Sequence, residues 1–305
     1  MILCCGEALI DMLPRTTKSG DSAFVPVPGG AVFNTAIALG RLGVEAGFFS
    51  GLSSDFFGEI LRESLNKSHV DSQLASVSDR PTTLAFVRFA NGQARYAFYD
   101  ENTAGRMLET ADLPQIPGHI QTLFFGGISL VSEPCGSAYE ALLLREGHCT
   151  SMLDPNIRPG FVTDEPTYRA RLDRMMAQTD ILKLSDDDLG WLYGEGDLHS
   201  QARDLIAKGA KLVLVTEGAK GATAYTAQHR VFVPAKPAQV VDTVGAGDTF
   251  NAGVLASLSA QGMLDKQALQ AIGKPALIAA LTYGIHAAAI TVARAGANPP
   301  WKKEL

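Results

Sequence analysis

The stretch DTVGAGDTFNAG, residues 242–253, is the most informative part of this 305-residue chain for both fold and function. A strand-like run at 231–233 precedes it and a helical pattern follows it. Its small residues let backbone N–H groups crowd together at the start of that helix, where unpaired donors and the positive dipole end suit an anion. Asp248 follows these donors and could accept the proton of an alcohol that attacks phosphorus. We therefore predict an anion hole at 245–247 with Asp248 as the catalytic base.

A Gly-x-Gly-Asp string alone also describes an ordinary helix start, with glycine in the turn and an acidic residue in the first helical turn. The rest of the chain has to decide between these two interpretations. Two other phosphate- or nucleotide-binding patterns are missing from the sequence. No Gly-x-Gly-x-x-Gly follows the first predicted strand, which argues against a dinucleotide-binding dehydrogenase, and no Gly-x-x-x-x-Gly-Lys-Ser/Thr occurs, which excludes a P-loop kinase.

Short apolar runs alternate with helical patterns along the chain. The predicted strands are 2–5, 46–50, 122–125, 150–153, 181–184 and 211–216. The predicted helices are 30–42, 55–67, 136–145, 168–178, 200–208 and most of 245–292, with a break at 273–275. Buried strands separated by helices predict an α/β fold with a mostly parallel sheet.

Two segments depart from this alternation. The runs 83–89 and 95–99 flank Asn91-Gly92, the strongest hairpin signal in the chain, and 24–27 follows a polar, turn-rich stretch. We predict a small β-sheet lid formed from about residues 12–28 and 82–104, within a single domain spanning 1–305. An edge extension of the main sheet is the alternative.

Composition narrows the class of protein. The net charge of −6 argues against non-specific nucleic-acid binding, which needs a basic face. The four cysteines form no Cys-x-x-Cys pair, so packed thiols in a reducing compartment are expected rather than zinc or redox chemistry. No signal peptide is visible, and the apolar run 278–292 contains Tyr283 and His286 and suits a buried helix. We expect a cytoplasmic protein without membrane or nucleic-acid partners.

Five motifs in family order resemble the PfkB (ribokinase-like) carbohydrate kinases and span nearly the whole chain. They are Gly6-Glu7-Ala8-Leu9-Ile10-Asp11, Pro28-Gly29-Gly30-Ala31 with Asn34, Asp154-Pro155-Asn156-Ile157-Arg158, Thr216-Glu217-Gly218-Ala219-Lys220-Gly221, and the stretch 242–253. The resemblance implies a three-layer α/β/α ribokinase-like sandwich with a small β-sheet lid.

The resemblance also implies a role for each matching residue. In the catalytic group, Asp248 would be the base beside the anion hole of Gly245, Ala246 and Gly247. Sugar would be bound by Asp11, Gly29, Gly30, Asn34, Tyr99 and Arg158. The nucleotide would be bordered by Lys183, Ser185, Thr216, Gly218, Gly221 and His286. A monovalent cation would be held by Asp242, Val244 and Gly296. Asp188 stands where the family has a glutamate tied to Mg²⁺, and its shorter carboxylate suits contact through water.

The implied reaction is transfer of the ATP γ-phosphate to a sugar hydroxyl, with Mg²⁺ and K⁺ as cofactors. The opening motif, Glu133-Pro134 and Arg95-x-x-Phe98-Tyr99 resemble fructokinases, so D-fructose to fructose 6-phosphate is the first expectation. A 2-keto-3-deoxygluconate kinase, in which Arg95 or Arg158 would bind the carboxylate, and a ribokinase or nucleoside kinase remain alternatives. A non-catalytic sugar-binding regulator is the alternative of another class, and the lid is a candidate surface for a homodimer.

Overall fold

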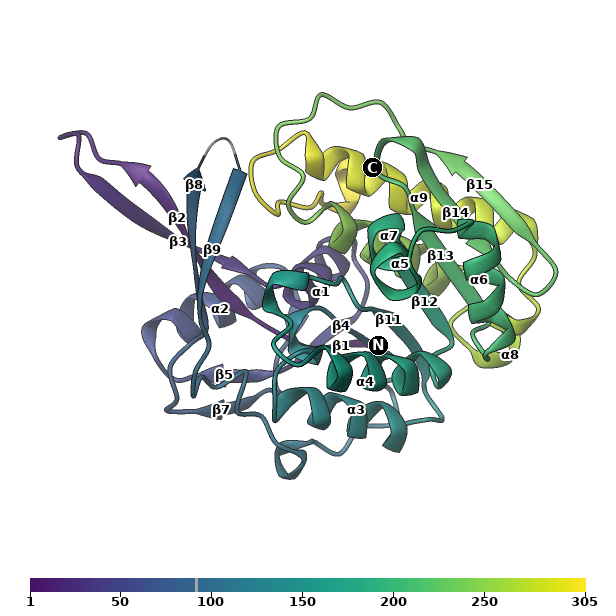
Figure 1. Ribbon diagram of the computed structural model, residues 1–305, viewed down its shortest axis with the longest axis horizontal. Coiled ribbons are helices and arrows are strands. Elements are labelled where there is room, and N and C mark those ends of the chain that lie inside the picture. The colour runs from purple at the N-terminus through teal and green to yellow at the C-terminus, as the bar shows by residue number, and fades with distance from the viewer. Residues whose placement is uncertain (91–92) are drawn as a thin grey trace.

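The computed structural model describes residues 1–90 and 93–305, and side chains outside 88–96. Its centre is a nine-stranded sheet in the order β15-β14-β13-β12-β11-β10-β1-β4-β6 (Figure 1). The strands from β13 to β6 pair in parallel, and β14 and β15 pair antiparallel at one edge. The bounds are β1 Ile2–Cys5, β4 Ala46–Phe49, β6 Val70–Asp71, β10 Thr122–Gly126, β11 Thr150–Asp154, β12 Ile181–Ser185, β13 Leu212–Thr216, β14 Gly221–Tyr225 and β15 Arg230–Pro234.

Helices cover both faces of this sheet. One layer consists of α1 Ala31–Arg41, α2 Phe56–Lys67, α7 Ala246–Ala260, α8 Lys266–Gln270 and α9 Lys274–Val292. The other consists of α3 Cys135–Arg145, α4 Glu165–Ala177, α5 Asp186–Tyr193 and α6 Leu198–Ala207. Successive residues of β1 alternate between the two faces, so Cys4 joins the first core and Cys5 the second. The predicted three-layer α/β/α sandwich is confirmed.

Short elements complete the described chain. They are the 3₁₀ turns η1 Thr110–Asp112, η2 Ile128–Leu130, η3 Pro159–Phe161, η4 Gly218–Lys220 and η5 Lys302–Glu304, and the parallel strand pair β5 Gly51–Ser53 and β7 Ser76–Ser78.

The helix α9 is long and apolar enough, by length and composition alone, to cross a membrane, a test that core helices of soluble proteins also pass. In this fold it packs against α7. The two helices approach closely where glycines meet, since a Cβ on Gly253 would lie 2.7 Å from the Cα of Gly284. The helix α9 therefore packs into the same hydrophobic core as α7 and supports it.

A second, four-stranded sheet projects from the main body in the order β3-β2-β8-β9 (Figure 1). Its strands are β2 Leu9–Thr16, β3 Ser22–Gly29, β8 Leu84–Ala90 and β9 Gln93–Tyr99. The alternative of an edge extension is thus wrong, because this sheet is separate from the central one. Its edge strand β3 contains Pro26 and Pro28, which is where proline is tolerated in a sheet. The predicted turn Asn91-Gly92 lies outside the described residues.

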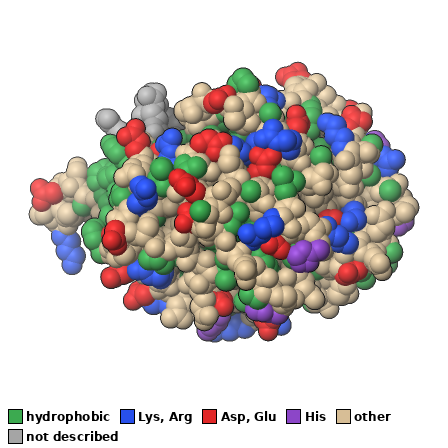
Figure 2. All heavy atoms as spheres, turned by 90° about the horizontal axis from the view of Figure 1, so that it is seen from below, with side chains coloured by type: hydrophobic (Ala, Val, Ile, Leu, Met, Phe, Trp, Pro, Cys, Tyr) green, Lys and Arg blue, Asp and Glu red, His purple; other side chains and the backbone are tan. Residues whose placement is uncertain are grey.

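The carboxyl ends of β1, β10, β11, β12 and β13 share one edge of the central sheet. Ligands of open α/β sheets bind outside this edge. On the face seen in Figure 2, acidic and basic side chains are interspersed, and hydrophobic side chains gather at the end from which the lid projects. The candidate site is therefore sought at the carboxyl edge beneath the lid.

Candidate active site

Asp248 lies in the first turn of α7 and is buried. The amide nitrogen of Asn34, in α1, donates a 2.9 Å hydrogen bond to Asp248 Oδ2. Burial raises the pKa of Asp248 from 3.8 to about 7; the Asn34 hydrogen bond and the Lys183 charge lower it, whereas the charges of Asp154 and Glu7 raise it. A carboxylate with this pKa can take up or release a proton near neutral pH.

The start of α7 is built on a left-handed glycine. Gly245 is the N-cap with φ 77°, and a Cβ there would lie 2.7 Å from the Cβ of Ala297. Thr249 N donates to Gly245 O at 2.9 Å and Ala246 N to Thr243 O at 3.3 Å. Helix geometry leaves the N–H groups of the first turn without intrahelical acceptors. The turn at 245–247 therefore offers backbone donors beside Asp248.

A buried ion pair lies behind this turn. Lys183 Nζ is 3.0 Å from Asp154 Oδ2, and Asn251 Nδ2 donates to the same oxygen at 2.7 Å. Burial alone would lower the pKa of Lys183, but the charges of Asp154, Asp188 and Asp248 raise it, so the ammonium stays charged. A Cβ on Gly247 would lie 3.5 Å from this nitrogen. The pair joins β11 and β12 to α7 and sets positive charge against the predicted anion hole.

Glu7, on the loop after β1, fixes the start of α1. Its carboxylate accepts from Ala31 N at 2.7 Å, Val32 N at 3.4 Å and Ser129 N at 3.1 Å. Burial raises the pKa of Glu7, although these backbone donors oppose the shift. Gly30 caps α1 with φ 109°, and a Cβ there would lie 2.7 Å from the Glu7 carbonyl oxygen. Close packing against Glu7 therefore requires glycine at position 30 and holds Asn34 in reach of Asp248.

Asp11 lies on β2 at the base of the lid. Burial raises its pKa from 3.8 to about 6. Its carboxylate lies over Gly29, where a Cβ would come within 2.3 Å of Oδ2. The two predicted sugar ligands Asp11 and Gly29 are thus brought together.

The strand register separates Tyr99 from Asp11. Asp11 pairs with Ala85 and Ala85 with Phe98, so these side chains share one face of the lid. Tyr99 pairs with Leu84 on the opposite face, where its ring packs edge-on against Phe86 at 5.5 Å. Among the side chains that the structure describes on this strand, Phe98 is therefore the aromatic one that faces the same way as Asp11. The side chain of Arg95 lies outside the described part of the chain.

The carboxylate of Asp188 closes the start of α5. Its Oδ2 accepts from Ser185 N at 2.8 Å and from Ser185 Oγ at 2.7 Å, and its Oδ1 accepts from Ile157 N at 2.8 Å. These bonds join Ser185 and Asp188 to the loop that carries Arg158. The Arg158 guanidinium bonds to the carbonyl oxygens of Asn156 and Ile157, at 3.4 and 3.1 Å.

The residues predicted to border the nucleotide lie on several structural elements. Thr216 ends β13, Gly218 lies in η4, and Gly221 begins β14. His286 lies on α9, and its Nε2 is 2.6 Å from Lys236 Nζ. A pocket of about 370 Å³ is lined by both of these residues and by Pro237, Ala238, Ala289, Ile290, Ala293 and Arg294.

Asp242 closes a loop onto the chain after α9. Its Oδ1 accepts from Val244 N at 3.0 Å and its Oδ2 from Gly296 N at 2.9 Å. The three residues predicted to hold a monovalent cation are thus linked through one carboxylate. Its oxygens, together with backbone carbonyls, are the donors that a hard cation prefers.

Sequence reasoning gave no role to Glu7, Asp154 or Asn251. All three belong to matched motifs, but the partners of Glu7 and Asp154 are distant in sequence, for example Asn251 for Asp154. The available signal was a charged residue within or beside an apolar strand, since a buried charge needs a partner.

Three comparisons with known proteins agree with this geometry. The model of the pfkB family carbohydrate kinases matches residues 1–304. A fructokinase of Rhizobium leguminosarum bv. trifolii is 54% identical over 278 residues, which cover 91% of this chain and 85% of that protein. Among solved structures, a Xylella fastidiosa fructokinase with bound ATP superposes with a TM-score of 0.88 at 28% identity, covering 97% of this chain and 93% of that one. A Vibrio cholerae fructokinase variant with fructose, ADP and potassium ion bound gives 0.83 at 25% identity, with coverages of 97% and 93%.

Proposed function

The chain belongs to the pfkB family of carbohydrate kinases, and we propose that it transfers the γ-phosphate of ATP to O6 of D-fructose. The single observation that supports this activity most directly is the 2.9 Å hydrogen bond between Asn34 and Asp248. It places the helix that follows the Gly29-Gly30 loop against the helix that begins at the anion hole. A sugar bound at the Gly29-Gly30 loop would therefore lie next to Asp248, the proposed base on α7.

In the proposed reaction the sugar hydroxyl gives its proton to Asp248 as its oxygen forms a bond to the γ-phosphorus. ADP then leaves with the electrons of the broken phosphorus–oxygen bond. Charge on the transferring group is stabilised by first-turn N–H groups of α7 and by the Lys183 ammonium behind them. These donors are fixed before the reaction, since Lys183 is held by Asp154 and the turn by Gly245.

We propose that Asp11, Gly29, Gly30 and Asn34 position the sugar, together with Arg158 on the loop after β11. Asp11 has a carboxylate at the base of the lid, and its face of the sheet also carries Phe98. Phe98, rather than the predicted Tyr99, is the proposed apolar cover over the sugar when the lid closes.

ATP is proposed to bind along Thr216, Gly218 and Gly221, with adenine in the pocket between His286 and the 236–238 segment. The Asp188 Oδ1 atom accepts one hydrogen bond and keeps a lone pair, so it fits a role in binding Mg²⁺ through water. When bound, Mg²⁺ would neutralise phosphate charge. Asp242, Val244 and Gly296 fit the proposed K⁺ site.

An ADP-release assay tests this proposal. Fructose, ribose, 2-keto-3-deoxygluconate and adenosine are compared at equal concentration, with and without K⁺. The highest kcat/KM is expected for fructose, and K⁺ is expected to raise it. A higher kcat/KM for another acceptor would overturn fructose as the substrate, and no ADP release with any of them would favour the sugar-binding regulator.

We further propose that two copies pair through their lids in the cytoplasm. Phe24, Phe86 and Tyr99 form an edge-to-face aromatic group there, and the Phe24 and Tyr99 side chains are exposed. Light scattering after gel filtration should give twice the chain mass, and Phe24→Asp should shift it to the monomer. A wild-type monomer at all concentrations would contradict the pairing.

A further inference from the structure

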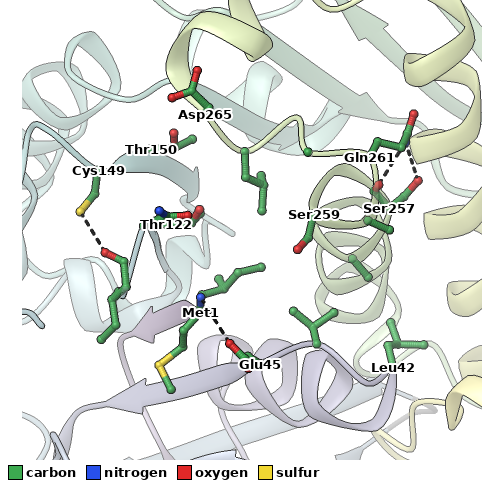
Figure 3. Close-up of a pocket in the computed structure, with 18 of the residues that line it drawn as sticks. Met1, Leu42, Glu45, Thr122, Cys149, Thr150, Ser257, Ser259, Gln261 and Asp265 are labelled. Atoms are coloured by element: carbon green, nitrogen blue, oxygen red, sulfur yellow. Dashed lines mark hydrogen bonds and ion pairs between the residues drawn. The ribbon is translucent and has the colours of Figure 1, made fainter. Parts of the chain in front are cut away.

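The amino edge of the central sheet carries a pocket of about 1080 Å³, at the opposite ends of the strands from the active site (Figure 3). The starts of β1, β10 and β11 line it, together with the C-terminal end of α7. In Figure 3, Cys149 lies beside Thr122 and Thr150 on one wall, and Ser257 and Ser259 lie on α7 across from it. The proposed kinase reaction uses none of these side chains.

Three different metal-ligating groups meet at this wall, and two of them, His148 and Cys149, line the pocket. Glu146, His148 and Cys149 belong to the turn between α3 and β11, and one donor atom from each lies within 4.8 Å of the others. Cys149 Sγ is 3.5 Å from His148 Nε2, and Glu146 Oε2 is 3.8 Å from His148 Nδ1.

The first of these distances is the one that a tetrahedral metal would impose. With Zn–S of about 2.3 Å and Zn–N of about 2.0 Å, sulfur and nitrogen around a tetrahedral ion lie about 3.5 Å apart. The separation of Cys149 Sγ and His148 Nε2 therefore already fits a shared ion. Glu146 contacts the other ring nitrogen, Nδ1, so its carboxylate has to move toward the Nε2 side. Oxygen and nitrogen around a tetrahedral zinc ion lie about 3.4 Å apart, so this approach amounts to at most about 1.5 Å from the 4.8 Å limit on the three donor atoms.

Neighbouring side chains hold this turn in place. Lys266 Nζ donates to Gly147 O at 2.8 Å, and Arg145 Nε donates to Glu146 Oε1 at 2.7 Å. The Cys149 thiol also contacts the Ile120 carbonyl at 3.6 Å. That contact and burial account for a packed cysteine, and the Arg145 ion pair accounts for the position of Glu146. Neither accounts for the exposed His148 imidazole against the thiol.

We propose that Glu146, His148 and Cys149 bind one Zn²⁺ ion, with the remaining coordination position open to the pocket. A mixed sulfur, nitrogen and oxygen donor set suits a borderline divalent metal. On binding, the thiol proton is released to solvent and the thiolate bonds to the metal. The site needs no contribution from ATP or sugar, so it stands independently of the proposed substrate.

Cobalt(II) is the probe for this site, added to the full chain produced without a polyhistidine tag. Wild type should show a thiolate-to-cobalt charge-transfer band that saturates at one ion per chain and disappears when Zn²⁺ is added. Cys149→Ser should abolish the band. Cys135→Ser is the matched control, because that buried thiol bonds to the carbonyl oxygens of Ser129 and Ser132 and should leave the band unchanged.

His148→Ala provides a second test that folding does not confound, because the His148 side chain is 74% exposed. Competition with a chromophoric chelator should show Zn²⁺ binding weakened by at least about 10- to 100-fold, while kinase activity stays at the wild-type level. A wild type without the band, a band that survives in Cys149→Ser or disappears in Cys135→Ser, or a His148→Ala variant with unchanged Zn²⁺ affinity would each overturn the proposal.

Discussion

Asp248→Asn should remove the chemistry and strengthen the fold. Asparagine has the shape of aspartate, and its side-chain oxygen can still accept the 2.9 Å hydrogen bond from Asn34. It cannot take up the hydroxyl proton, so kcat should fall by about 10²- to 10⁴-fold. ATP affinity should be largely preserved, because the proposed nucleotide residues lie on other elements.

The gain in stability follows from the pKa of Asp248, which is raised by burial from 3.8 to about 7. The folded protein binds this proton more tightly than the unfolded chain, so ionisation costs stability as pH rises from about 4 through about 7. A shift of about three pKa units corresponds to about 4 kcal/mol at pH 8 and about 2 kcal/mol at pH 5.5. Because the asparagine does not titrate, the stability advantage of the variant should grow by about 2 kcal/mol between these pH values.

Urea unfolding of both proteins at pH 5.5 and 8, beside ADP release at saturating fructose, measures these effects. All other ionisable groups are the same in both proteins, so their contributions largely cancel in the difference. A variant that keeps a tenth of the wild-type kcat would refute the role of Asp248 as base. A stability difference that stays constant with pH would refute the raised pKa.

A pH profile and three further variants test neighbouring contacts. In wild type, kcat/KM for fructose should fall about tenfold per pH unit below about pH 7 as Asp248 is protonated. The hydrogen bond from Asn34 lowers the pKa of Asp248, so Asn34→Ala, which removes that bond, should move the midpoint of this pH profile upward. Asp11→Ala should lower kcat/KM for fructose by about 10- to 100-fold, as expected for a lost hydrogen bond to a charged group, while KM for ATP changes little. Lys183→Met leaves the Asp154 carboxylate buried without its cation and should lower the free energy of unfolding by about 3–5 kcal/mol, measured by urea titration.

Local sequence patterns predicted the helices and strands of the three layers well, because the interactions that start and end these elements lie between residues close in sequence. The predicted helix 55–67 corresponds to α2, Phe56–Lys67, and its cap is local, since Asp55 Oδ1 accepts from Gly58 N at 2.7 Å. The strand β2 fell only partly within the predicted lid range 12–28 and was not predicted as a separate strand, because Pro14 and polar residues interrupt its apolar pattern. Its formation depends on pairing with β3 and β8, and β8 lies some seventy residues away in the chain.

The sequence predicted which residues belong to the candidate site, but not which of them contact one another. The motif 242–253 indicated a base, and the resemblance indicated a sugar loop. Neither indicated that Asn34 bonds to Asp248 itself, across 214 positions of sequence, or that Glu7 joins the sugar loop to Ser129. Both contacts join segments that meet at the carboxyl edge only after the parallel sheet has formed.

The shorter carboxylate of Asp188 shows how such contacts decide a residue's role. Both oxygens of Asp188 already accept hydrogen bonds, two at Oδ2 from Ser185 and one at Oδ1 from Ile157 N. An oxygen of a carboxylate has two acceptor positions, so only Oδ1 can serve a further ligand. A direct Mg²⁺ bond would compete with the contact that fixes the loop before Arg158, whereas a metal-bound water could donate to the free position. The shorter side chain therefore combines a structural cap with contact to Mg²⁺ through water, and Asp188→Glu should disturb the cap of α5 before it improves metal binding.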